Sequence, residues 1–247
     1  MAQRAGTIHV ARIRGILFDK DGTLLDHEAT WEPITVAIAE HAAGGDPALR
    51  DRLLEHGGFD TRTRKFRAGT PLAAGTPPEI AATWAEVLGT ATPPDLRGTI
   101  DRMFDSGSGS SQLLPGIREA LLRLRGEASF LGIATSDSMA GIASSLGHHD
   151  VLDLFDFLAG YDSGHGIKPG PGMVQAFCRA TRLDPSEVAV VGDNTHDLRM
   201  AMAAGAGLKI GVLSGTSEHD DLAGEADLVI ESVAVLPDHA GFMRTLG

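Results

Sequence analysis

Two aspartates separated by one residue follow an apolar run near the start of the chain, in "ILFDKDGTLLD" (residues 16–26). Carboxylates a few ångströms apart raise each other's affinity for protons unless they share a cation. Asp19 and Asp21 therefore indicate bound Mg²⁺, a division of roles between a nucleophile and an acid, or both. We expect Lys20, which lies between them, to point away from the shared site and to contribute mainly its backbone N–H.

Polar groups suited to the same chemistry follow three later apolar runs. Thr135 and Ser136 in "GIATSD" offer hydroxyls and free backbone N–H groups at the start of a helix, which suit a phosphate group. Lys168 in "GHGIKPGP" offers a cation for phosphate oxygens, and "VVGDNTHD" adds Asp193 and Asp197. These residues are candidates for one binding site.

Each of these motifs also has a purely structural interpretation. Thr135 and Asp193 would be ordinary helix caps, and an isolated lysine such as Lys168 is most often solvated. Their order along the chain favours the functional interpretation. An acidic pair, a threonine, a Lys-Pro step and a Gly-Asp step each follow one of four successive predicted strands, and four independent coincidences do not explain that order.

The elements that must position these residues alternate between short β-type runs and longer helical segments. This alternation is typical of an α/β protein with a parallel sheet covered by helices, a Rossmann-like three-layer core. Ligands of such sheets bind beyond the carboxyl ends of the strands, which is where the candidate residues fall. The predicted strands span residues 13–19, 128–135, 155–160, 188–193, 208–212 and 227–230.

The alternation is interrupted between the first and second strands, where the connection over residues 20–127 is far longer than a normal βα crossover. We expect an inserted all-α cap domain there, with helices over residues 29–43, 47–56 and 77–89. The expected division is a core of residues 1–24 and 110–247 and a cap of residues 25–109. The Gly- and Ser-rich "DSGSGSS" (residues 105–111) suits a flexible hinge at its end.

Composition narrows the possible partners. The chain has 247 residues and a formal net charge of −12, which argues against nucleic acid and anionic membrane surfaces as partners. Its single cysteine, Cys178, cannot form an internal disulfide, so redox chemistry is not indicated. We find neither a signal-peptide pattern nor 18 consecutive apolar residues, and we expect a cytoplasmic protein. A monomer and a homodimer both remain open.

The motif set resembles the haloacid dehalogenase superfamily, in particular its phosphoglycolate phosphatase-like branch with a helical cap. The matching segments are "DKDGT" (19–23), "ATS" (134–136), "KP" (168–169) and "GDNTHD" (192–197). Position 20 is lysine where an apolar residue is commoner in that family, and Ser136 stands where many members have asparagine. These departures weaken any inference of this chain's substrate from the substrates of family members.

The resemblance implies a role for each matching residue. Asp19 would be the nucleophile and a Mg²⁺ ligand. Asp21 would be the general acid and base, with its backbone carbonyl also a ligand. The remaining roles are the second carboxylate ligand, Asp193; phosphoryl binding by Thr135, Ser136 and Lys168; and organisation of the metal shell by Asn194 and Asp197.

The function implied is a Mg²⁺-dependent phosphatase that hydrolyses a small phosphomonoester through an aspartyl-phosphate, with 2-phosphoglycolate as the leading candidate. Asp21 argues against a dehalogenase, because members that cleave carbon–halogen bonds lack the second acidic residue. Two alternatives stay open. A sugar phosphomutase would use the same core, and a non-catalytic binding protein on this fold would be expected to have lost one of the catalytic carboxylates or the lysine.

Substrate choice would fall to the cap, where "TRTRKFRAGTPLAAGT" (residues 61–76) gathers four basic side chains in an otherwise acidic protein. An arginine fork is well matched to a carboxylate. Arg67, which adjoins the Gly- and Pro-containing loop, is the candidate for binding a second anionic group on the substrate. The alternative is that this charge run is an ordinary solvated face.

Overall fold

The computed structural model describes residues 12–128 and 130–246 and contains a six-stranded parallel sheet at its centre. The strands are ordered β5-β4-β1-β6-β7-β8, and every neighbouring pair is parallel. The strands are β1 (Gly15–Phe18), β4 (Phe130–Ala134), β5 (Phe157–Ala159), β6 (Val188–Gly192), β7 (Leu208–Val212) and β8 (Leu228–Ile230). The predicted α/β fold is confirmed.

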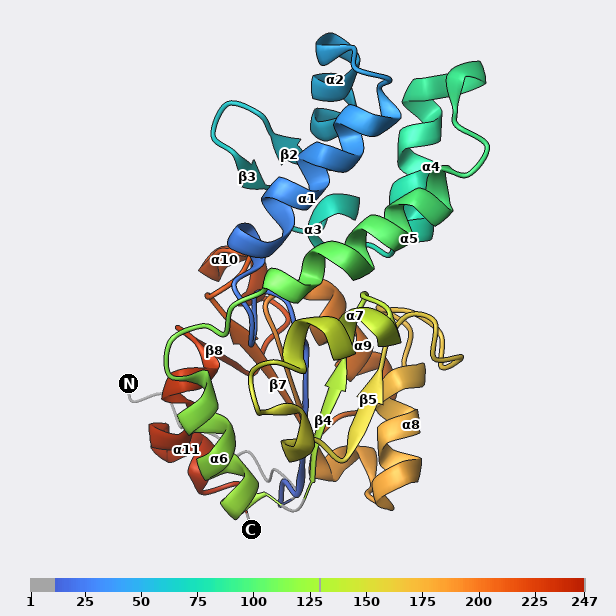
Figure 1. Ribbon diagram of the computed structural model, residues 1–247. Helices are drawn as coiled ribbons and strands as arrows, with labels where there is room; N and C mark the ends of the chain where they lie inside the picture. The colour runs from blue at the N-terminus through green and yellow to red at the C-terminus, as the bar shows by residue number, and fades with distance from the viewer. Residues whose placement is uncertain (1–11, 129, 247) are drawn as a thin grey trace.

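Helices cover both faces of this sheet, because its strands are apolar on both sides. In β1, Ile16 and Phe18 belong to one apolar cluster and Leu17 belongs to another, which gives the three layers visible in Figure 1. The first cluster includes residues of α6 (Ile117–Glu127) and α7 (Met139–Leu146), and the second includes residues of α8 (Gly172–Thr181) and α9 (Thr195–Ala204). The remaining elements of this part are η3 (Leu152–Leu154), η4 (Pro185–Glu187), α10 (His219–Leu222), η5 (Val233–Asp238) and α11 (Ala240–Met243).

The long connection after β1 forms a second, mainly helical lobe above the carboxyl ends of the strands (Figure 1). This lobe has an apolar cluster of its own, which includes Trp31, Leu53, Trp84 and Ile100. Its elements are α1 (His27–Ala42), α2 (Pro47–Gly57), β2 (Phe59–Asp60), β3 (Lys65–Phe66), α3 (Pro71–Ala74), α4 (Pro77–Leu88), η1 (Gly89–Ala91), α5 (Leu96–Gly107) and η2 (Ser108–Ser110). Within the described ranges, no helix is both long and apolar enough to cross a membrane.

The lobe differs from the sequence-based expectation in two places. It contains the small antiparallel hairpin β2–β3, whose turn is held by the Asp60 carboxylate, which accepts hydrogen bonds from the backbone N–H groups of Arg62 and Thr63. Residues 105–107 are the last turn of α5, and η2 follows directly, so the segment expected as a flexible hinge is helical over most of its length.

Candidate active site

The loop that follows β1 turns sharply and directs two carboxylates into one cleft. The backbone N–H of Asp19 still bonds to β6, at Val191 O, and three residues later Gly22 adopts a left-handed φ of 80°. A Cβ at Gly22 would lie 2.7 Å from Asp193 Oδ2. Glycine is therefore required here both for the turn and for the close approach of the fourth motif.

The cleft lies between the sheet and the lobe and encloses about 580 Å³ of space, part of which is open to solvent. The structure brings together eight of the nine candidate residues at its sheet side, and it adds Asp137 and His196 to them. The sheet-side lining consists of Asp19, Asp21, Thr135, Ser136, Asp137, Lys168, Asp193, Asn194, His196 and Asp197.

Lys168 forms two buried ion pairs in the cleft. Its Nζ lies 2.5 Å from Asp19 Oδ1 and 2.6 Å from Asp197 Oδ1. Burial lowers the pKa of Lys168, but the two carboxylates more than offset that effect and hold the pKa above its ordinary value. The lysine is therefore a cation near neutral pH, next to the predicted nucleophile.

Three buried carboxylates meet beside this lysine. Asp19, Asp193 and Asp197 each offer one oxygen, and these oxygens lie within 4.8 Å of one another. Burial, together with Asp19 and Asp197, raises the pKa of Asp193. Burial likewise raises the pKa of Asp19 to about 7, although Lys168 opposes the shift.

This donor set fits a hard divalent cation. One lysine cannot neutralise three carboxylates, and closely spaced carboxylate oxygens are the ligands that Mg²⁺ and Ca²⁺ prefer. Asp193 is held in place for such a role, because the backbone N–H of Thr216 donates to its Oδ2 at 2.8 Å. Asn194 caps α9 and accepts from the N–H of His196, which fixes the start of the helix that carries Asp197.

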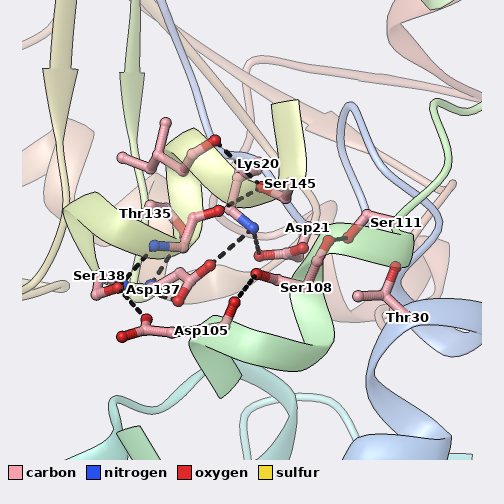
Figure 2. A network of polar contacts seen from close by, with 12 residues as sticks. Lys20, Asp21, Thr30, Asp105, Ser108, Ser111, Thr135, Asp137, Ser138 and Ser145 are labelled. Carbon is pink, nitrogen blue, oxygen red and sulfur yellow. Dashed lines mark hydrogen bonds and ion pairs between the residues drawn. The ribbon is translucent and has the colours of Figure 1, made fainter. Parts of the chain in front are cut away.

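Lys20 differs from the sequence-based expectation, which gave it little more than a backbone N–H. Its side chain is completely buried, with Nζ 2.7 Å from Asp21 Oδ2 and 3.0 Å from Asp137 Oδ2. The same ammonium lies 5.6 Å from the centre of the Trp31 ring in the lobe. Figure 2 shows Lys20 between the two carboxylates. Burial raises the pKa of Asp137, and the ion pair with Lys20 opposes that shift.

The oxygens of Asp21 consequently have different surroundings. Oδ2 is paired with Lys20, whereas Oδ1 is buried without a hydrogen-bond partner among the described residues. Because Asp21 also lines the cleft, one oxygen is held and the other is left available. That arrangement suits a carboxyl group that exchanges a proton with a bound molecule.

Direct hydrogen bonds join the lobe to the sheet side of the cleft. The Ser136 hydroxyl donates to Ala74 O at 2.9 Å, and the Ser138 hydroxyl donates to Asp105 Oδ1 at 2.6 Å, the latter visible in Figure 2. The Tyr161 hydroxyl donates to Asp101 Oδ1 at 2.6 Å. The hydroxyl of Ser136, a candidate phosphate ligand, is thus engaged by the lobe in this conformation.

Arg67 is the candidate residue that the structure does not bring to the cleft. Its guanidinium pairs with the Glu55 carboxylate at 3.0 Å and also contacts the Glu55 carbonyl oxygen, on an exposed face of the lobe. Arg64 is paired with Glu32 in the same way. These two arginines of the basic cluster are therefore neutralised locally by acidic residues from α1 and α2.

Comparisons with known proteins agree with the fold. The model of the haloacid dehalogenase-like hydrolase family matches residues 13–205. A phosphoglycolate phosphatase of Photorhabdus laumondii is 30% identical over 195 residues, 78% of this chain and 77% of that protein. One of Chromobacterium violaceum is 28% identical over 94% of this chain and 98% of that protein. A putative haloacid dehalogenase-like hydrolase from Bacteroides fragilis superposes with a TM-score of 0.71 at 23% identity, covering 91% of this chain and 99% of that one.

Proposed function

The chain belongs to the haloacid dehalogenase-like hydrolases, and we propose that it hydrolyses a small phosphomonoester with the help of a divalent cation. The observation that carries the proposal is the grouping of Asp19, Lys168 and Asp193 in one buried cluster at the carboxyl edge of the sheet. A carboxylate nucleophile, a fixed cation and further carboxylates for a metal are what phosphoryl transfer requires, since the reaction depends on in-line positioning and on relief of negative charge.

Mg²⁺ is the cation that we propose. Asp19, Asp193 and the backbone carbonyl of Asp21 would hold it, and Asn194 and Asp197 would shape its surroundings. When bound, it would neutralise charge on the phosphoryl group. The proposal is supported by the three carboxylate oxygens within 4.8 Å of one another and by the excess of carboxylates over cations in the cleft.

Two displacements at phosphorus make up the proposed reaction. An oxygen of Asp19 attacks phosphorus, the bond to the alcohol oxygen breaks, and the alcohol leaves with a proton supplied by Asp21. Asp21 then takes a proton from water as that water attacks the aspartyl-phosphate, which releases phosphate and restores Asp19. Lys168 neutralises charge on the transferred group throughout, with Thr135 and the backbone near Ser136 as further donors.

The lobe would serve as a cap over this chemistry. We propose a catalytic core of residues 1–24 and 110–247, of which residues 1–11, 129 and 247 lie outside the described structure, and a cap of residues 25–109. The apolar cluster of the lobe, separate from those that cover the sheet, supports this division. The similar phosphoglycolate phosphatases make 2-phosphoglycolate the first substrate to test.

Phosphate release tests the proposal. We expect the purified chain to release phosphate from a panel of small phosphomonoesters, including 2-phosphoglycolate and 4-nitrophenyl phosphate, with Mg²⁺ and not with excess EDTA. The nearly isosteric Asp19→Asn should lose turnover by far more than tenfold, because an amide is a poor nucleophile toward phosphorus. Folding of the variant is checked by circular dichroism. Residual activity within tenfold of wild type in a folded variant would contradict the assignment of Asp19 as the nucleophile.

A further inference from the structure

The lobe side of the cleft is uncharged. It is lined by the apolar side chains of Trp31, Leu72, Ile80 and Phe104, by the small residues of the segment 73–75, and by His27 and Thr35. Trp31 and Phe104 pack against each other with their ring centres 4.6 Å apart. A group that leaves the phosphorus and extends toward the lobe therefore meets two aromatic rings and two aliphatic side chains.

Lys168, Lys20 and Arg67 are each already paired with carboxylates. Among the residues that line the cleft, Lys168 is the only lysine or arginine, and it pairs with two carboxylates. Lys20 is buried against Asp21 and Asp137, and Arg67 is held by Glu55 on the outer face of the lobe. A carboxylate on the leaving group would find no free cation among the described residues that line the cleft. It would also lose its hydration among apolar side chains, which is costly.

His27 also leaves the lobe side of the cleft, its wall opposite the sheet, uncharged. Burial lowers the pKa of His27 to about 4, although the nearby Asp21 carboxylate opposes the shift, so the imidazole is uncharged near neutral pH. Its Nδ1 is buried and has no hydrogen-bond partner within the described structure. An unpaired buried nitrogen is itself unfavourable, and a hydroxyl or amide donor on a bound molecule would satisfy it.

We propose that the preferred substrate is the phosphate monoester of an uncharged alcohol, with an aromatic or branched apolar body seated against Trp31 and Phe104 and a neutral donor near His27. The inference rests on the proposed phosphomonoesterase function and narrows its substrate class. It predicts a lower kcat/KM for esters of carboxylate-bearing alcohols, including 2-phosphoglycolate, than for neutral esters of the same size.

Two matched pairs of substrates test this ranking in the wild-type enzyme with Mg²⁺. The first is 4-carbamoylphenyl phosphate against 4-carboxyphenyl phosphate, and the second is 2-hydroxyethyl phosphate against 2-phosphoglycolate. Each pair keeps the size of the leaving group nearly constant and changes its charge. We expect kcat/KM to favour the neutral member by about tenfold or more, the usual effect of an unpaired buried charge. Equal or higher kcat/KM for the carboxylates would overturn the inference and leave the phosphatase proposal intact.

A gain of charge in the wall provides the complementary test. Ala73 lines the cleft and is partly exposed, so Ala73→Arg introduces a guanidinium, with Ala73→Gln as a long, uncharged control. We expect the arginine variant alone to shift the ratio of kcat/KM for 4-carboxyphenyl over 4-carbamoylphenyl phosphate upward by about tenfold. An unchanged ratio in a folded variant would mean that leaving groups do not reach this wall. If no ester is turned over by the wild type, the phosphatase proposal itself fails.

Discussion

Lys20 contacts one residue of its own loop and two residues from other parts of the chain. It neutralises Asp21 in its own loop and Asp137 beyond β4, and it lies over the Trp31 ring of the lobe. Both of its ion pairs are protected from water, because the Lys20 side chain is 0% exposed and those of Asp21 and Asp137 are 13% and 3% exposed. In this buried position, the main effect of the ammonium is to neutralise two carboxylates whose burial would otherwise be energetically costly.

Replacement of Lys20 should therefore destabilise the protein. Lys20→Met removes the ammonium and keeps an unbranched chain, so the free energy of unfolding should fall by roughly 3–5 kcal/mol, the usual cost of breaking a buried ion pair. The double variant Lys20→Met/Asp137→Asn should recover part of that loss, since it removes the stranded charge. Urea denaturation of both variants measures the effect. A loss below about 1 kcal/mol would show that Lys20 is dispensable for stability. No recovery in the double variant would show that the loss does not come from an unpaired Asp137 charge.

Residue types and order predicted most of the candidate site but not its internal pairing. Asp19, Thr135, Lys168 and Asp193 each follow an apolar strand, so the rule for parallel sheets is enough to bring them together. The ion pair of Lys20 with Asp137 could not be predicted. Asp137 lies next to Lys20 only because of the register of β1 against β4, in which Phe18 pairs with Ile133. A single sequence contains no direct signal for that register.

At the scale of elements, the sharp turn after β1 requires a glycine at position 22. Gly22 has φ 80°, and a Cβ there would lie 2.7 Å from Asp193 Oδ2 and 2.9 Å from Gly215 Cα. The Asp193 carboxylate would have to move, and the loop around Gly215 with it. A displacement of about 1 Å can lower the rate a hundredfold. We therefore expect the position of Asp193, and so the activity, to depend on the lack of a side chain at Gly22.

Gly44→Ala is a matched control for Gly22→Ala. Both glycines have a positive φ, and Gly44 has φ 60° with no atom within 4 Å of the place that a Cβ would take. Each variant should lose about 1–2 kcal/mol of stability through left-handed strain. Only Gly22→Ala should also lower kcat/KM toward 4-nitrophenyl phosphate, by about a hundredfold. Similar activities of the two variants would mean that the turn tolerates a side chain beside Asp193.

Helices and strands could be predicted where their pattern of apolar residues extended over several positions. All six strands of the sheet were predicted to within a few residues, because each is a short, largely apolar run between helical segments. The hairpin β2–β3 has two residues per strand, too few for an alternating pattern. Helix α5 carries its buried positions Leu96, Ile100 and Phe104 at a spacing of four, but Gly98 and the Gly- and Ser-rich end concealed that signal.

For the whole molecule, the concentration of carboxylates in the cleft links stability to pH. Burial raises the pKa of Asp19 to about 7 from its ordinary value of 3.8. Between these two pH values the folded protein holds a proton that the unfolded chain has released, so stability falls as pH rises through this window. Asp193, whose pKa is raised by burial and by its carboxylate neighbours, acts in the same direction. A cation that replaces those protons should reverse the loss.

Added Mg²⁺ should therefore raise the melting temperature more at pH 8 than at pH 5.5. At pH 5.5 the cation competes with protons for Asp19 and Asp193, whereas at pH 8 the carboxylates are open to it. At a hundred times its dissociation constant, a ligand adds about 2.7 kcal/mol of stability. For a chain of this size that corresponds to roughly 5–10 °C. Differential scanning fluorimetry with Mg²⁺ or with EDTA measures the shift, and Asp193→Asn should abolish most of it. Equal shifts at both pH values, or an equal shift in the variant, would place the cation elsewhere.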